Sequence, residues 1–223
     1  MKKFLKRIVA FCNKTWYGQL IADHFRCIYA SDPLKIKLKI CNEGSIRIKK
    51  KIIGCNNMLD VGDSSLLQNV RIIVHGSNNG IHIGKGCIFG ERTKLWIEGN
   101  GCELYFGDGC TISHDNEFLC QENGKRIVIG NDCMFSHHIN VRTSDSHPIF
   151  NETGERANSP QNVIIGNHVW VAPFSFIMKG VEIGEGAIVG SCAVVTKSVP
   201  EKCLVVGIPA KIVRDNVRWE RYL

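Results

Sequence analysis

The chain has 223 residues, of which 44% are hydrophobic and 22% charged, a composition that fits one compact globular domain and leaves little room for a second. Its eleven cysteines include no CxxC pair, so we expect free thiols in a reducing compartment, with neither disulfides nor structural zinc. The net charge of +7 is uneven, because residues 1–51 hold 13 Lys and Arg against three acidic residues, which leaves the rest of the chain acidic.

Residues 1–36 form a basic segment with an amphipathic start. Phe4, Leu5, Ile8 and Val9 share one helical face, and most of the nearby cations lie on the other. The apolar run is too short for a signal peptide or a membrane span, so we expect a cytoplasmic protein. The helix either contacts the anionic inner face of the cytoplasmic membrane or steers an acidic substrate, or it only caps the domain that follows.

Apolar residues recur every six positions between residues 37 and 206. The clearest series is Ile165, Val171, Ile177, Ile183, Val189 and Val195, and the same phase is marked upstream by Val61-Gly62, Ile83-Gly84, Phe106-Gly107 and Ile129-Gly130. Three hexads make one triangular coil, whose backbone pairs with the next coil at about 4.8 Å. The period predicts an all-β solenoid, since the strands of an ordinary sandwich would not hold it.

The coils that open at residues 83 and 106 are longer than eighteen residues. Successive openings are 23 residues apart, and an Asn-Gly pair in each interval supplies a turn for a five-residue excursion at one corner. Cys87, Cys110 and Cys133 each follow a coil opening by four residues. We therefore expect these thiols to form a ladder of small packed side chains.

The repeat breaks at residues 142–162, which form a long polar loop. Long loops on a rigid scaffold often carry the chemistry of a protein. His147 is the candidate general base, because an imidazole titrates near neutrality and can take a proton from a hydroxyl; a merely solvated histidine is the alternative. Asp145 and Glu155 are candidates to orient its ring, with loop solubility as the alternative.

Four segments between residues 127 and 216 follow one another in a specific order: IGNDCMFSHHINVRTSDSHPIF, NVIIGNHVWVAPFSFIMKGVEIG, VVTKSVP and GIPAKIVRDN. They resemble hexapeptide-repeat acyltransferases of the maltose, galactoside and xenobiotic acetyltransferase group, and most closely bacterial capsule and polysialic acid O-acetyltransferases. The resemblance implies a left-handed parallel β-helix, acetyl-CoA as donor without a metal, and a homotrimer with active sites between subunits. Handedness rests on the resemblance alone, because parallel crossovers are otherwise right-handed.

The resemblance also implies roles for single residues. His147, in SDSHP, matches a catalytic histidine that deprotonates the acceptor hydroxyl for direct attack on the thioester, and Trp170 matches a tryptophan beside the active site. The candidate acceptor-binding residues are Asn116, His137 and Arg142. His114 should stack on His137, and plain surface exposure is the alternative for both.

The resemblance further implies that the last coils and the tail bind coenzyme A. Backbone groups near Ala172, Pro173 and Ser191, together with the Thr196-Lys197 pair, would hold its arm, and Lys211 and Arg214 would meet its phosphates. Cys192, after Ser191, departs from the glycine-rich pair that is common there. The tail, residues 207–223, is expected to include a short helix.

The resemblance, together with the basic N-terminal segment, favours an O-acetyltransferase that acts on a bacterial surface glycan, such as a capsule, a lipopolysaccharide or a sialic acid-containing polymer. We expect an acidic acceptor and no nucleic acid partner. The main alternative is an acetyltransferase for an amino sugar, serine or an antibiotic. Two others are a non-catalytic scaffold and a γ-class carbonic anhydrase, although His114, His137 and His138 lack the spacing of its zinc ligands.

Overall fold

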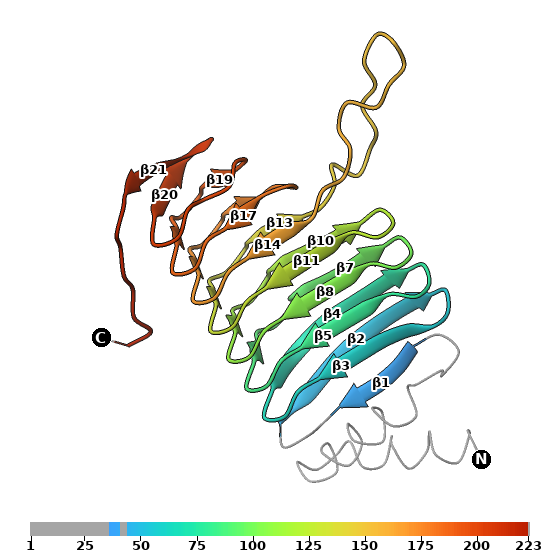
Figure 1. The fold of residues 1–223 in the computed structure, drawn as a ribbon. Helices are drawn as coiled ribbons and strands as arrows, with labels where there is room; N and C mark the ends of the chain where they lie inside the picture. The colour runs from blue at the N-terminus through green and yellow to red at the C-terminus, as the bar shows by residue number, and fades with distance from the viewer. Residues whose placement is uncertain (1–35, 41–43, 223) are drawn as a thin grey trace, which may run out of the picture.

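The structure, a computed structural model, describes residues 36–40 and 44–222, and the basic amphipathic helix expected at the N-terminus lies outside these ranges. The described chain winds into a stack of coils with three faces (Figure 1). Parallel pairing joins each coil to the next, so the predicted all-β solenoid is confirmed. Its left-handed sense stays a prediction.

The strands divide among the three faces. The first face holds β1 (Ile36–Ile40), β3 (Asn57–Val61), β5 (Gly80–Ile83), β8 (Glu103–Phe106), β11 (Arg126–Ile129), β14 (Val163–Ile165) and β17 (Glu182–Ile183). The second holds β6 (Ile88–Phe89), β9 (Thr111–Ile112), β12 (Met134–Phe135), β15 (Trp170–Val171), β18 (Ile188–Val189) and β20 (Leu204–Gly207). The third holds β7 (Lys94–Glu98), β10 (Glu117–Gln121), β13 (Asn140–Arg142), β16 (Phe176–Ile177) and β19 (Val194–Val195).

Two early strands run around a corner of the triangle. In β4 (Leu66–His75), the first residues pair with β6 on the second face, and residues after the bend at Asn69 pair with β7 on the third. β2 (Ile46–Ile53) pairs with β4 and shifts register after Ile46. The second and third faces therefore form one continuous sheet at this end of the solenoid.

The register of the first face agrees with the predicted coil openings. Val61 pairs with Ile83, Ile83 with Phe106, and Phe106 with Ile129, and the same row continues through Ile165 to Ile183. Glycine follows these positions because neighbouring coils approach closely at the corner: a Cβ built on Gly107 would lie 2.7 Å from the backbone nitrogen of Asn131.

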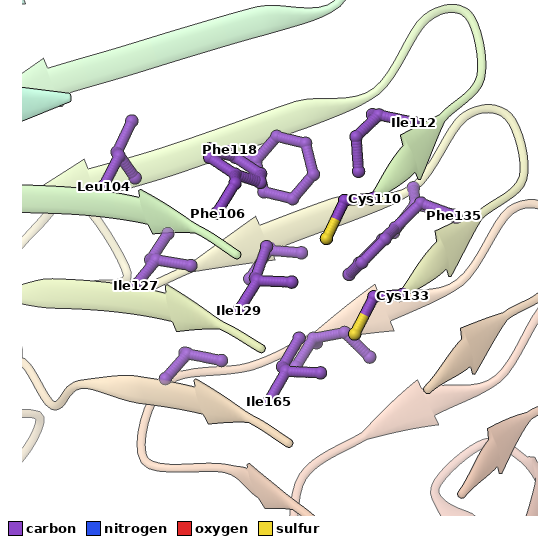
Figure 2. Close-up of a cluster of buried hydrophobic side chains, with 14 of the residues drawn as sticks. Leu104, Phe106, Cys110, Ile112, Phe118, Ile127, Ile129, Cys133, Phe135 and Ile165 are labelled. Carbon is purple, nitrogen blue, oxygen red and sulfur yellow. The ribbon is translucent and has the colours of Figure 1, made fainter. Parts of the chain in front are cut away.

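The interior is a column of aromatic and aliphatic side chains, part of which Figure 2 shows. Phe89, Phe106, Phe118 and Phe135 are fully buried and meet edge to face, with ring centroids 4.9, 4.9 and 5.5 Å apart along the series. Such pairs add about 0.5–1.5 kcal/mol to the gain from burial of their area. Rigid stacking of identical positions holds the coils in register.

The cysteine ladder also forms as predicted. Cys87, Cys110 and Cys133 are buried at the corner between the first and second faces, and their thiols donate to the carbonyls of Gly107, Gly130 and Gly166 in the next coil at 3.0–3.1 Å. Contact with the Cys133 thiol, together with burial, raises the pKa of Cys110 to about 12. All three thiols are buried and donate to a carbonyl of the next coil, so the ladder has a packing role.

The C-terminal tail contradicts one expectation. The short helix expected within residues 207–223 is absent from the described residues 207–222, where β21 (Ala210–Arg214) instead pairs antiparallel with β20. A cis bond between Ile208 and Pro209 lies in the turn that joins these two strands. Within the described ranges, no helix is long and apolar enough to cross a membrane.

Candidate active site

The interruption of the repeat forms an arm, residues 143–162, that projects from the corner between the third and first faces (Figure 1). Its outer part is a short antiparallel hairpin, in which Phe150 pairs with Arg156 and the amide of Ala157 donates to the carbonyl of Ile149 at 2.8 Å. Ile149 and Phe150 are 58% and 59% exposed, so the arm carries its apolar tip away from its own solenoid.

Charged contacts fix the base of the arm. Arg156 makes two hydrogen bonds to the carboxylate of Glu122, one of them 2.7 Å long, and Ser144 donates to the same group. Chiefly because of the Arg156 guanidinium, the pKa of Glu122 falls from 4.5 to about 2. Lys179 binds Asp145 on the other side, so the arm is attached to the coils both below and above it.

His147 lies where the arm leaves this base, and its side chain is exposed. Its carbonyl accepts a hydrogen bond of 2.8 Å from Asn158, but its ring has no hydrogen-bond partner among the described residues. Neither candidate orienting group contacts it: Asp145 binds Lys179 and Asn158, and Glu155 binds Asn151 and Thr153 within the hairpin turn. The arrangement leaves an unobstructed imidazole that can accept a proton.

Trp170 is half-buried on the outside of the second face, beside the C-terminal tail. Its ring centroid lies 6.1 Å from that of Trp219, which is buried and stacks on His168 at 4.1 Å. Arg221 secures the tail through Asp132, at 2.7 Å. Sequence reasoning missed Trp219 and Arg221, because they lie beyond the last hexad and no repeat phase assigns them a face.

One chain does not bring all the predicted residues together. His147 and the Thr196-Lys197 pair lie at the corner between the third and first faces, whereas Trp170 lies on the opposite second face. Ala172, Pro173 and Ser191 stack at the corner between the second and third faces, where the amide of Cys192 donates to the carbonyl of Pro173 at 2.9 Å. Lys211 and Arg214 are exposed on β21.

The structure corrects the role expected for Asn116. This side chain is fully buried, and its amide donates to the carbonyls of Ser113 and Ser136 at 3.0 and 2.7 Å while its oxygen accepts from the amide of Ile139. Its hydrogen bonds link adjacent coils and leave no atom for an acceptor, so a substrate-binding role is wrong. Arg142 is half-buried at the end of β13, and its Nε donates to Asn140 at 2.8 Å.

His137 belongs to an aromatic stack at the corner between the second and third faces. It lies parallel to His114, with centroids 5.0 Å apart, as the sequence predicts, and Phe174 packs against His138 at 5.0 Å. Ligand atoms of His114, Asp115 and His138 lie within 4.8 Å of one another, a donor set that suits a transition metal. The Arg92 fork already binds Asp115, and it holds the pKa of this carboxyl well below its usual range.

Comparison with known proteins adds to this geometry. Residues 162–197 match the bacterial transferase hexapeptide family (six repeats). Polysialic acid O-acetyltransferase of Escherichia coli O1:K1 / APEC is 39% identical over 82 residues, 36% of this chain and 27% of that protein. Galactoside O-acetyltransferase of Escherichia coli (strain K12) is 34% identical over 80 residues, 34% of this chain and 38% of that protein. The matched segment thus spans less than half of each relative.

Solved structures extend the likeness to most of the chain. The polysialic acid O-acetyltransferase OatWY superposes with a TM-score of 0.77 at 30% identity, over 84% of this chain and 89% of the solved one. The structural match thus covers much more of the chain than the sequence matches, which span about a third of it.

Proposed function

Since the chain belongs to the hexapeptide-repeat acyltransferase family, we propose that it transfers an acetyl group from acetyl-CoA to a hydroxyl of a bacterial surface glycan. The leading candidate acceptor is an acidic polymer. The observation that carries this proposal is the likeness to OatWY over 84% of the chain, because the name of that protein specifies both the reaction and an acidic glycan. The exposed His147 on a fixed arm supplies the group that such a transfer needs.

In the proposed reaction His147 acts as the general base. Its ring takes the proton of the acceptor hydroxyl while that oxygen attacks the thioester carbonyl carbon, and the tetrahedral oxyanion forms. The carbon–sulfur bond then breaks, and the imidazolium returns the proton to the leaving thiolate of coenzyme A. No covalent enzyme intermediate is needed, because the site only positions the two substrates and moves one proton.

We further propose a homotrimer whose sites lie between subunits. His147 and Trp170 are on different sides of the solenoid, so both contact one substrate only if the arm of one chain reaches the second face of another. The same holds for coenzyme A: one chain offers Ala172, Pro173 and Ser191 at one corner, and another offers Thr196 and Lys197. Lys211 and Arg214 are exposed and available to phosphates.

A small acceptor is the second candidate. Galactoside O-acetyltransferase, with 34% identity over 80 residues, is named for a small sugar. An acetyltransferase for such a molecule would use the same base and the same donor. The two candidates differ in whether acceptor contacts extend beyond the arm.

The test is release of free coenzyme A thiol from acetyl-CoA, with polysialic acid, neutral capsule polysaccharide, galactosides and amino sugars as acceptors. We expect turnover on the acidic polymer, and a decrease of about 10²- to 10⁴-fold in kcat/KM for His147→Ala. His82→Ala, on the first face away from the arm, is the matched control and should keep wild-type turnover. Turnover on small acceptors alone would replace the leading proposal with the second, and an active His147→Ala would exclude the proposed base.

A further inference from the structure

Cations lie side by side on the third face of the early coils. Lys49 of β2 pairs in register with Arg71 of β4, and Arg71 pairs with Lys94 of β7. Because parallel strands are about 4.8 Å apart, these three side chains leave the same face one above another. Lys51, two residues along β2, is exposed beside them. We call Lys49, Lys51, Arg71 and Lys94 the cationic ladder.

Most of the cationic ladder is not neutralised within the described chain. Lys94 binds the carboxylate of Glu117, but Lys49, Lys51 and Arg71 are exposed and have no acidic partner among residues 36–40 and 44–222. Like charges directly opposite on neighbouring strands destabilise a sheet. A ligand that places negative charges along this row would remove that repulsion.

A second column of paired residues begins at Lys51 and runs beside Lys49, Arg71 and Lys94, and its middle residues are apolar. In the neighbouring column, Lys51 is followed on successive coils by Ile73, Trp96, Leu119 and Arg142. Trp96 is half-buried, and the ammonium of Lys94 lies 5.5 Å from its ring centroid. An aromatic ring next to cations suits a sugar that carries a carboxylate, because the ring packs against the sugar while the cations bind the acid.

The column also leads to the candidate active site. It ends at Arg142, the last residue of β13, where the arm with His147 begins, and Figure 1 shows β2, β4, β7 and β10 stacked in order toward that arm. From β2 to β13 there are four coil steps, or about 19 Å. A polymer with its reacting sugar at His147 could therefore have distal sugars on the cationic ladder, whereas a monomer could not.

We propose that the cationic ladder and Trp96 bind the distal part of an anionic polysaccharide chain whose reacting sugar lies at the arm. This inference rests on the proposed function, and it adds a second binding region with dependence on acceptor length. A membrane surface fits this face less well, because Leu119 is 7% exposed and Trp96 half-buried, so neither can insert into lipid.

The experiment compares two triple variants with equal charge change. The ladder variant is Lys49→Gln/Lys51→Gln/Arg71→Gln, and the control is Lys85→Gln/Arg126→Gln/Lys202→Gln, three exposed cations off the third face. Fluorescence anisotropy with labelled polysialic acid, as long chains and as dimers, gives affinities without acetyl-CoA. Thiol release then gives kcat and KM on the same acceptors.

We expect the ladder variant to weaken binding of long chains, and to raise their KM, by about tenfold, since each exposed ion pair contributes little but three add up. Dimer kinetics and kcat should stay unchanged, the control should match wild type, and Lys49→Arg/Lys51→Arg/Arg71→Lys should retain binding. Salt should weaken binding of long chains to wild type and reduce the difference between wild type and ladder variant.

Three results would overturn the inference. First, the ladder variant and the control could bind long chains with equal affinity. Second, the ladder variant could lose as much affinity for dimers as for long chains. Third, the ladder variant could bind long chains like wild type but no longer sediment with phosphatidylserine vesicles, which would assign the face to a membrane. Failure of the proposed function is distinct, because wild type would then bind long chains through the cationic ladder without any thiol release.

Discussion

The solenoid interior and the arm are held by different forces. Between residues 83 and 141 the interior positions repeat apolar side chains that are buried and stacked coil on coil, so each contact is repeated by its neighbours. The arm instead depends on a few polar contacts, chiefly the Arg156–Glu122 pair and the Lys179–Asp145 pair. The comparison teaches that stability and activity should respond to different substitutions: the interior should control unfolding and the arm should control catalysis.

Removal of one interior ring should have the largest effect. Phe118→Ala leaves a cavity between Phe106 and Phe135, and we expect the free energy of unfolding to fall by about 3–5 kcal/mol in chemical denaturation. Tyr105→Ala, a 46% exposed position on the outside of β8, is the control and should change it by less than about 0.5 kcal/mol. Equal losses at both positions would contradict the assignment of the interior.

Release of the arm should affect activity more than stability. Arg156→Gln removes both hydrogen bonds to Glu122, and we expect kcat/KM on the glycan to fall about tenfold because His147 loses its fixed position. The melting temperature should fall by no more than about 2 °C, since a partly exposed ion pair contributes little to global folding. A large drop in melting temperature with unchanged kcat/KM would reverse the division between interior and arm.

The smallest effect concerns pH. Arg156 lowers the pKa of Glu122 from 4.5 to about 2, so this carboxyl stabilises the native state fully above about pH 4.5 and loses that contribution as the pH falls through about 2. The difference in unfolding free energy between wild type and Glu122→Gln, below about 1 kcal/mol, should be constant from pH 7 to 5 and shrink toward zero below that. A difference that grows at low pH would contradict the assigned charge state.

The sequence predicted the solenoid because its evidence is repetitive. Each opening residue, such as Ile83 or Phe106, is confirmed by its partner one coil away, so one error of phase would have disturbed the whole series. Repetition also applies to Asn116, which lies one coil, or 23 residues, after Thr93. The Thr93 side chain donates to the carbonyl of Ser113, and the Asn116 side chain donates to the carbonyl of Ser136, each in the next coil. Its interior position could thus have been predicted.

Other features had no repeat to reveal them. The contact of Trp219 with His168 spans 51 residues, and Trp219 lies beyond the last hexad. Residues Ala210–Arg214 form a strand where a helix was expected, because the hexad pattern does not show that β20 has an unpaired edge for them. The arm could be located by the break in the period, but its ion pairs could not be, because Arg156 and Glu122 are 34 residues apart in segments of unlike phase.

The reversal of direction at β21 has a further consequence for the ends of the molecule. A stack of parallel strands has no inherent length, because its last strand always has an unpaired backbone edge. A strand of a second molecule could pair with that edge. On the second face that edge is occupied by an antiparallel strand that carries Lys211 and Arg214 outward. The edge strand on this face is therefore β21, and its exposed cations Lys211 and Arg214 disfavour the addition of a strand from another molecule, which limits growth into fibres at this edge.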